Sequence, residues 1–298
     1  MSVKSDLHTH TTYCDGANTP EEMVRAALAL GMDCLGFSGH SYTFFDESYC
    51  MTRDGTQAYR AEINALKKRY AGQISILCGV EQDYWSEEGT EPYDYVIGSA
   101  HYLRVGGQYL PVDESADIQR RVVADCFGGD WYAFAEAYFD TVAGVVERTG
   151  CDIIGHFDLV SKFNEREHLF DERHLRYTAA WQAAADRLLR SGKPFEVNTG
   201  AIFRGYRSVP YPTAEMTDYI RARGGTFLLS SDSHSTAALC YAFSEYEGAL
   251  GQSLLSLHSA LPSVFLPERG LLEGFQVRKC SGFPPPNAGT TGKTEGER

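Results

Sequence analysis

The stretch Asp6-Leu7-His8-Thr9-His10 stands at the start of the chain, and Asp232-Ser233-His234 answers it near the far end. In each stretch two metal-type ligands are separated by one residue, and on an extended strand that spacing places both side chains on the same face. Imidazole and carboxylate groups on one face are typical of a divalent metal site. Either stretch alone occurs by chance in many proteins. Whether the two form a metal site therefore depends on whether the intervening chain carries further ligands in the same pattern.

Seven short segments of the chain have the pattern of buried strands. Most are continuous apolar runs rather than alternating ones, as expected for parallel strands that are covered on both faces. The predicted strands span residues 3–8, 34–38, 74–80, 95–100, 151–155, 194–198 and 226–231.

Helical patterns lie between most of these strands. A Thr19 cap followed by Pro20 and two acids predicts a helix start, and Gly31 predicts its end. Alternation of strands and helices predicts a parallel α/β fold, and seven such units in this length favour a closed barrel over a doubly wound sheet. Further helices are expected over 57–70, 130–149, 172–191 and 213–223, with a last one after residue 235.

The composition limits the classes of function. The chain has 298 residues and a formal net charge of −13, which argues against binding long nucleic acid, because such proteins carry a basic face. No apolar run approaches the roughly 20 residues of a membrane span, and no signal-peptide pattern stands at the N-terminus, so a cytoplasmic protein is expected. Eight cysteines form no Cys-x-x-Cys pair, which predicts reduced thiols.

The layout along the chain predicts one domain with a tail. Residues 1–282 are expected to form a single barrel domain. Within it, residues 102–129 are a polar, glycine-containing insertion that is expected to form a lid or a wall of the pocket. Residues 283–298 are rich in Pro, Gly, Thr, Lys and Glu, which predicts a disordered tail.

Metal-type side chains stand at or just after the ends of six of these seven strands. In a parallel barrel those ends share one rim, where active sites are built, and if the barrel closes, the first and last strands are neighbours. So many buried imidazoles and carboxylates need cations to balance them. They exceed the four to six ligands of one ion, so two or three divalent ions of zinc, manganese or iron are expected. The residues are His8, His10, Asp15, His40, Glu81, His101, His156, Asp232 and His234.

This motif series resembles the PHP (polymerase and histidinol phosphatase) family, from residue 4 to about residue 250. Besides the two terminal stretches, the resemblance is carried by Gly39-His40, Glu81, Ser99-Ala100-His101 and Gly155-His156. It implies a distorted seven-stranded (β/α)7 barrel of parallel strands that holds three metals. The ligand sets that it implies are His8, His10, Glu81 and Asp232; Glu81, His101 and His156, with Glu81 bridging; and Asp15, His40 and His234.

In length and layout the chain is most similar to those family members that hydrolyse L-histidinol phosphate in histidine biosynthesis. The resemblance implies a metal-dependent phosphomonoesterase that releases L-histidinol and phosphate through attack by metal-activated hydroxide. Glu81 is expected to act at the metals, and Asp15, Asp158 or a metal-bound water to protonate the leaving group. The expected partner is a small phosphate ester, and the sequence does not indicate an oligomeric state.

Cationic and aromatic residues near the strand ends are candidates for substrate binding. Lys162 follows the fifth strand, and Arg204 and Arg207 follow the sixth, where each is predicted to clamp phosphate rather than to be a solvated surface cation. Tyr42 and Tyr102 follow two of the histidines and are predicted to stack on the imidazole of the substrate, although ordinary packing explains them as well. The substrate amine has three candidate partners: Asp46, Glu47 and Asp83.

Three alternatives stay open from the sequence. The first is a PHP phosphoesterase for a sugar phosphate, a nucleotide or an oligonucleotide end. The second is a non-catalytic PHP module, which the full ligand set disfavours. The third is an amidohydrolase-type barrel, which needs a bridging lysine after a middle strand, and none stands at the corresponding place after the fourth strand.

Overall fold

Seven parallel strands form the central sheet of the computed structural model, which describes residues 5–261 within one compact unit. The predicted strands all form, and most begin and end within one or two residues of the predicted limits. In sheet order they are β1 (Ser5–Asp6), β2 (Cys34–Phe37), β3 (Ser75–Asp83), β4 (Tyr95–Ser99), β7 (Ile153–Ile154), β8 (Phe195–Asn198) and β9 (Phe227–Ser230).

The first and last strands meet, so the sheet curls into a nearly closed barrel. Thr9 and Ser233, just beyond β1 and β9, form a parallel bridge. The amide of His10 donates to the carbonyl of Ser233 at 2.8 Å, and the amide of Ser233 donates to the carbonyl of His8 at 3.0 Å. The two stretches that open and close the motif series therefore lie side by side, and the predicted barrel of seven parallel strands is confirmed.

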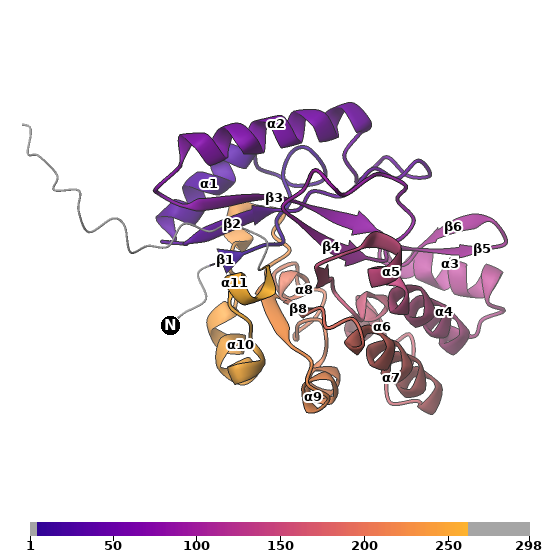
Figure 1. Ribbon diagram of the computed structural model, residues 1–298. Coiled ribbons are helices and arrows are strands. Elements are labelled where there is room, and N and C mark those ends of the chain that lie inside the picture. Colours follow the sequence, from indigo (N-terminus) through magenta and orange to yellow (C-terminus); the bar gives the residue numbers. More distant parts are fainter. Residues whose placement is uncertain (1–4, 262–298) are drawn as a thin grey trace, which may run out of the picture. The chain divides into compact units, whose positions relative to one another are not determined.

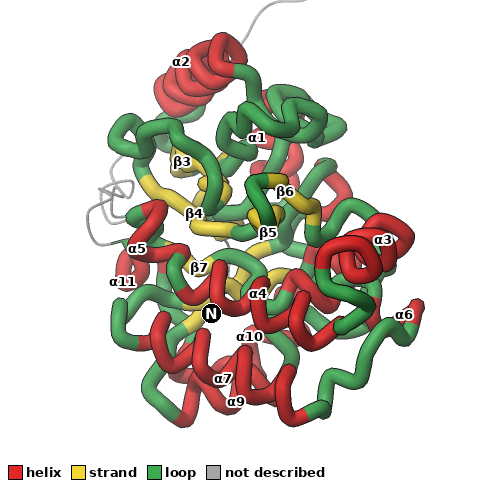
Figure 2. The backbone as a smooth tube through the Cα atoms, turned by 90° about the vertical axis from the view of Figure 1, so that its right-hand side faces the viewer, coloured by secondary structure: helices red, strands yellow, loops and turns green. Residues whose placement is uncertain are grey.

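Helices surround the strands, as Figure 2 shows for the yellow strands and the red helices around them. In residues 5–261 none of these helices is both long and apolar enough to cross a membrane. The α-helices are α1 (Pro20–Ala29), α2 (Arg53–Arg69), α3 (Ala116–Cys126), α4 (Trp131–Ala143), α5 (Val145–Thr149), α6 (Asn164–Glu167), α7 (Leu175–Leu189), α8 (Gly200–Phe203), α9 (Ala214–Ala222), α10 (Phe243–Leu250) and α11 (Leu257–Ala260).

Two helix boundaries differ from the prediction for local reasons. The helix expected over 130–149 is divided at Gly144 into α4 and α5, where a side chain would crowd Tyr84, since a Cβ at Gly144 would lie 3.2 Å from its hydroxyl. Helix α2 begins four residues before the predicted start. Thr52 caps it by accepting a hydrogen bond from the amide of Gly55 at 3.0 Å. Because Gly55 lies in the first turn, the sequence pattern did not indicate that the helix begins there.

The insertion at 102–129 is an antiparallel hairpin followed by helix α3. Strands β5 (Tyr102–Val105) and β6 (Gln108–Pro111) pair with each other and not with the barrel, and in Figure 1 they lie beside α3 at one edge. Gly106 and Gly107 make the turn with positive φ angles of 58° and 85°, which glycine adopts without strain. The predicted end of the barrel at 282 and the predicted disordered tail at 283–298 lie outside the described residues.

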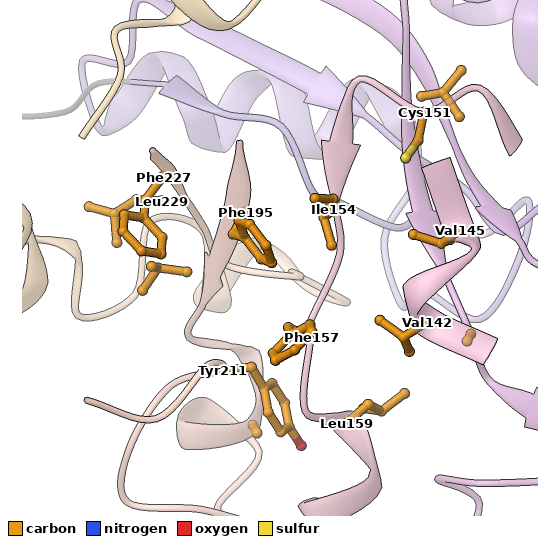
Figure 3. Packing of buried hydrophobic residues seen from close by; sticks show 14 of the residues in the cluster. Val142, Val145, Cys151, Ile154, Phe157, Leu159, Phe195, Tyr211, Phe227 and Leu229 are labelled. Carbon is orange, nitrogen blue, oxygen red and sulfur yellow. The ribbon is translucent and has the colours of Figure 1, made fainter. Parts of the chain in front are cut away.

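Apolar side chains pack between the barrel strands and the surrounding helices, and a second set fills one end of the barrel interior. Between the strands and α4, Phe157 packs edge-on against Phe195 at 5.6 Å between ring centres, with Ile154 and Val142 nearby (Figure 3). Burying each large apolar side chain contributes roughly 1.5–3 kcal/mol. A second cluster takes most of its residues from the barrel strands, together with Leu7 directly after β1 and Leu261 directly after α11; the others are Cys34, Leu77, Tyr95, Ile97, Ile153 and Leu228.

This second cluster places the polar residues at the other end of the barrel. Along a strand every second side chain lies on the same face. Glu81, Ser99 and Ser230 therefore share a face with Leu77, Ile97 and Leu228 but stand closer to the carboxyl ends of β3, β4 and β9. The apolar end of the barrel is plugged, and the carboxyl end carries the predicted ligands.

Candidate metal centre

A single buried carboxylate, that of Glu81 in β3, has five imidazoles around it. The side chain is 1% exposed, and Ser99 donates a hydrogen bond from Oγ to Oε1 at 2.6 Å. The imidazoles come from four strand ends that are far apart in the sequence. Their nitrogens lie 2.8 Å (His156 Nε2) and 3.4 Å (His101 Nε2) from Oε1, and 2.9 Å (His40 Nδ1), 3.1 Å (His8 Nε2) and 3.6 Å (His10 Nε2) from Oε2.

Two further carboxylates extend this cluster toward solvent. Asp232 Oδ1 lies 3.2 Å from His10 Nε2 and 3.6 Å from His234 Nδ1. Asp15 Oδ2 lies 3.1 Å from His234 Nε2 and 3.7 Å from His40 Nε2. The structure thus brings together all nine side chains that the strand-end pattern singled out.

The cluster divides into four overlapping groups, each with its ligand atoms within 4.8 Å of one another. All four groups share members with the implied ligand sets, yet the grouping differs: His8 joins Glu81 and His156, and His40 joins Glu81 and His101. Which ligand serves which ion stays a prediction. The groups are His10, Asp15, His40 and His234; His8, Glu81 and His156; His8, His10 and Asp232; and His40, Glu81 and His101.

The residues fit a divalent cation, because buried lone pairs converge without partners. Within the described residues, four side-chain atoms of the cluster are buried and make no hydrogen bond: His8 Nε2, His10 Nε2, Glu81 Oε2 and His156 Nδ1. Leaving such atoms unsatisfied costs about 1–3 kcal/mol each. Imidazole and carboxylate together suit zinc, manganese and iron, so bound cations would satisfy the first three of these atoms.

The electrostatics of the cluster favour positive charge at its centre. Burial and the neighbouring imidazoles of His234 and His40 lower the pKa of His10 to about 3, which keeps this ring in the neutral form that binds metals. Burial alone would raise the pKa of Glu81, but the imidazoles around it hold the pKa well below its usual value. Burial acts to lower the pKa of His40, whereas Glu81 and Asp15 raise it to about 9. The carboxylates therefore attract a cation, either a proton or a metal ion.

Two carboxylates contact histidines of the cluster at the ring nitrogen that does not face Glu81. Sequence reasoning did not identify one of them, Glu196, and assigned the other, Asp83, to the substrate amine. Glu196 in β8 lies 2.5 Å from His8 Nδ1, and its signal was an acid inside a predicted buried strand. Asp83, named above only for the substrate amine, lies 3.3 Å from His101 Nδ1 and accepts the amide of His101 at 3.0 Å. Carboxylates that contact the second nitrogen of a histidine orient that ring for a metal.

A cavity of about 350 Å³ opens onto the cluster. Two predicted phosphate clamps border it: Lys162 pairs with Asp113 Oδ2 at 2.9 Å, and Arg204 pairs with Asp232 Oδ2 at 2.8 Å. The insertion contributes to the wall, through Tyr102 and through residues just after β6. Besides seven of the nine cluster residues, the lining consists of Asp46, Ser48, Tyr49, Tyr102, Pro111, Asp113, Glu114, Leu159, Lys162, Arg204 and Tyr206.

Several predicted residues lie outside this lining, among them Arg207, Asp158 and Tyr42. Arg207 is 6% exposed, and its Nη1 donates to Asp158 Oδ2 at 3.0 Å and to Ser161 Oγ at 2.9 Å. In the structure each of these two groups is the partner of the other, which gives no support to a phosphate clamp at Arg207 or a proton donor at Asp158, and both roles stay predictions. Tyr42 stacks with Arg53 at 4.8 Å, donates to Glu47 at 2.8 Å and lines a separate cavity, so its stacking on the substrate stays a prediction as well.

The Arg207–Asp158 pair is expected to matter for stability. Arg207→Ala should lower the free energy of unfolding by about 3–5 kcal/mol, because the buried charge of Asp158 loses its partner. The combined Arg207→Met and Asp158→Leu variant, which removes both charges, should recover most of that loss. Urea denaturation measures both effects. A single variant of wild-type stability with a raised KM would instead return Arg207 to the substrate site.

Comparisons with known proteins agree with this architecture. The model of the PHP domain family matches residues 6–200. A Deinococcus radiodurans protein named "Probable histidinol-phosphatase" is 30% identical over 260 residues, which cover 82% of this chain and 92% of that protein. The histidinol-phosphatase of Bacillus subtilis is 27% identical over 266 residues, with 82% and 98% covered.

A solved structure shares the fold. It is the crystal structure of histidinol phosphate phosphatase from Lactococcus lactis, complexed with zinc, L-histidinol and phosphate. It matches this chain with a TM-score of 0.63 at 19% identity, covering 85% of this chain and 95% of its own. At that identity the match is evidence of the fold alone.

Proposed function

This chain belongs to the PHP family, and from that premise we propose that it is a metal-dependent phosphomonoesterase that hydrolyses L-histidinol phosphate to L-histidinol and phosphate in histidine biosynthesis. The proposal depends above all on the nine-residue cluster around Glu81, which opens into a cavity with two cationic side chains at its border. The names of the relatives in Deinococcus and Bacillus support the choice of substrate.

The proposed cofactors are two or three divalent ions, which the nine clustered side chains would hold. When bound, such ions supply an activated water as nucleophile and offset the negative charge of the phosphate oxygens. The metal set of the Lactococcus lactis structure supports zinc as one of them.

The residues of the chain would bind and orient the phosphate. Lys162 and Arg204 present a primary ammonium and a guanidinium at the cavity, and charge-assisted hydrogen bonds to phosphate are the strong ones. Arg204 is already held by Asp232 Oδ2 and lies 3.0 Å from His234 Nδ1, which fixes it beside the cluster. Phosphate would enter between these two cations.

Asp15 would relay a proton from water to the leaving alkoxide rather than supply one of its own. Burial acts to raise its pKa, but the imidazoles of His40 and His234 hold the pKa well below its usual value, so the carboxyl group of Asp15 is ionised. Its side chain is 33% exposed, whereas those of Glu81 and Asp232 are 1% and 9% exposed. A group that exchanges protons with solvent must be reachable, and among the three carboxylates of the cluster Asp15 is the most exposed to the cavity and to water.

The far wall of the cavity suits an amine and a flat ring. The rings of Tyr49 and Tyr102 stack at 6.0 Å with 27° between their planes, and Tyr102 donates its hydroxyl proton to Asp46. Asp46 and Glu114 are further acids in the cavity lining. L-histidinol phosphate carries an ammonium and an imidazole, which match acids beside aromatic rings better than a sugar does.

The test is phosphate release from a panel of esters by the metal-loaded protein. We expect kcat/KM for L-histidinol phosphate to exceed those for glucose 6-phosphate and AMP by on the order of 100-fold or more, because a site with buried polar groups rejects substrates that leave them unpaired. A flat profile would favour a general PHP phosphoesterase, a nucleotide preference would favour the nucleotide alternative, and no release at all would favour a non-catalytic module.

Replacing Lys162 with Ala separates substrate binding from the metal centre. We expect KM for L-histidinol phosphate to rise roughly 10- to 100-fold, the value of one hydrogen bond to a charged group, with metal content unchanged. Lys193→Ala is the matched control, because Lys193 pairs with Asp152 at 3.1 Å away from the cavity lining. An unchanged KM in Lys162→Ala would remove this residue from the phosphate site.

A further inference from the structure

The buried carboxylate of Glu196 joins four strand ends beneath the metal centre. It is 1% exposed. Its Oε1 lies 2.5 Å from His8 Nδ1 and also accepts a hydrogen bond from Ser230 Oγ. Its Oε2 accepts the amide of His156 at 2.7 Å and a hydrogen bond from Asn198 Nδ2 at 3.1 Å. Every polar contact of this carboxylate is therefore a donor from the barrel itself.

The contact between Glu196 and His8 Nδ1 determines which ring nitrogen of His8 is available to bind a metal. An ionised carboxylate accepts but does not donate hydrogen bonds, so the proton of a neutral His8 ring must be on Nδ1. The other nitrogen, Nε2, then carries the lone pair. It is buried without a hydrogen bond and lies 3.1 Å from Glu81 Oε2 and 3.7 Å from Asp232 Oδ1. In this form His8 faces the cluster as a ligand.

The carboxylate of Glu196 holds His8 at its second nitrogen, 2.5 Å away. Other rings of the cluster are held less firmly at their second nitrogen. His156 Nδ1 makes no hydrogen bond, and His10 Nδ1 has the thiol of Cys14 at 3.6 Å and Asp15 Oδ1 at 3.7 Å.

We propose that Glu196 is a positioning residue that fixes the tautomer and the ring orientation of His8 for metal binding. The proposal rests on the metal centre of the proposed function, and it assigns no contact between Glu196 and the substrate. Without the carboxylate, His8 would be free to place its proton on Nε2, and the ring would then turn a donor toward Glu81 instead of a lone pair.

Asp6 provides a matched control. It is also fully buried, and it accepts hydrogen bonds from Ser231 Oγ and from the amides of Ser231 and Cys240, both at 3.1 Å. It holds strand ends together as Glu196 does. Its hydrogen bonds within residues 5–261 involve no imidazole ring, and only a long one, 3.4 Å, comes from the amide of His8. Glu196→Gln and Asp6→Asn therefore each replace one buried carboxylate by an amide, and only the first touches a ring of the cluster.

The experiment measures zinc affinity by competition with a chromogenic chelator, independently of activity. We expect Glu196→Gln to weaken zinc binding by about 10- to 100-fold, and excess zinc to restore most of the phosphate release. Asp6→Asn should bind zinc within about threefold of wild type even if both variants lose thermal stability. Equal zinc affinity in Glu196→Gln and wild type, or an equal loss in Asp6→Asn, would overturn the proposal.

A second measurement serves if Glu196→Gln does not fold. Nitrogen-15 NMR of the zinc-loaded wild-type protein reports the tautomer of each histidine. A proton on Nδ1 of His8 supports the proposal, and a proton on Nε2 refutes it. Zinc binding with no hydrolysis of L-histidinol phosphate would reject the proposed substrate alone and leave the role of Glu196 intact.

Discussion

Glu81→Gln is expected to abolish both metal binding and phosphate release. The carboxylate has five imidazoles within 3.6 Å, and an amide in its place removes the charge that balances a cation while turning N–H groups toward the lone pairs of those rings. We expect kcat to fall by roughly 10³-fold or more, because the stabilisation of charge in the transition state is lost together with the ions. Phosphate release and bound metal, measured on the same sample, check this result.

Glu172→Gln is the control for that variant. Glu172 is partly buried and accepts a hydrogen bond from Asn164 Nδ2 at 2.7 Å, but it does not line the cavity. It should keep wild-type metal content and activity. A Glu81→Gln protein that retains its metal and still hydrolyses the ester at the wild-type rate would contradict the central position of this carboxylate.

Removal of the metal ions with a chelator should have the second large effect, on activity and stability together. Without cations the buried carboxylates of Glu81 and Asp232 lose the metal charge that would balance them. A ligand present at about 1,000 times its Kd stabilises the folded state by about 4 kcal/mol, which for a chain of this size corresponds to a loss of Tm on the order of 10 °C after chelation. Phosphate release should fall to background.

Differential scanning calorimetry before and after chelation, followed by addition of zinc, manganese or iron, measures this effect. Recovery of both Tm and activity with one of these ions is expected, and the ion that restores both at the lowest concentration identifies the preferred metal. A chelated protein that keeps its Tm and its activity would show that the cluster needs no cation.

Most of the barrel could be predicted because parallel strands leave a strong signal. Their apolar runs are buried on both faces, and the ligand that follows each run marks the strand end. The strands around Glu81 and His40 were accordingly placed within a few residues, and closure followed from the match between the two terminal motifs. The helix break at Gly144 was not predicted, because a single glycine within a helical pattern is a weak signal, and the need to leave room for Tyr84 at this position appears only in the fold.

The sequence predicts which residues form the site but not which of them contact one another. Position on a strand end identifies a side chain that reaches the rim, whereas pairing depends on how neighbouring loops turn. Arg207 and Asp158 both follow strand ends, yet they form a hydrogen-bonded ion pair and do not line the cavity. Glu196 was overlooked for the opposite reason, since an acid within a buried strand has no sequence partner until the fold places His8 beside it.

The anomalous scattering of crystals grown with zinc or manganese tests the central claim most directly. If the histidines and acids of the cluster together bind a group of cations, strong anomalous peaks should flank the Glu81 carboxylate on both sides. Each peak should be in contact with imidazole nitrogens from at least two different strand ends. A map without any peak within about 3 Å of Glu81, from protein that hydrolyses L-histidinol phosphate, would contradict the account.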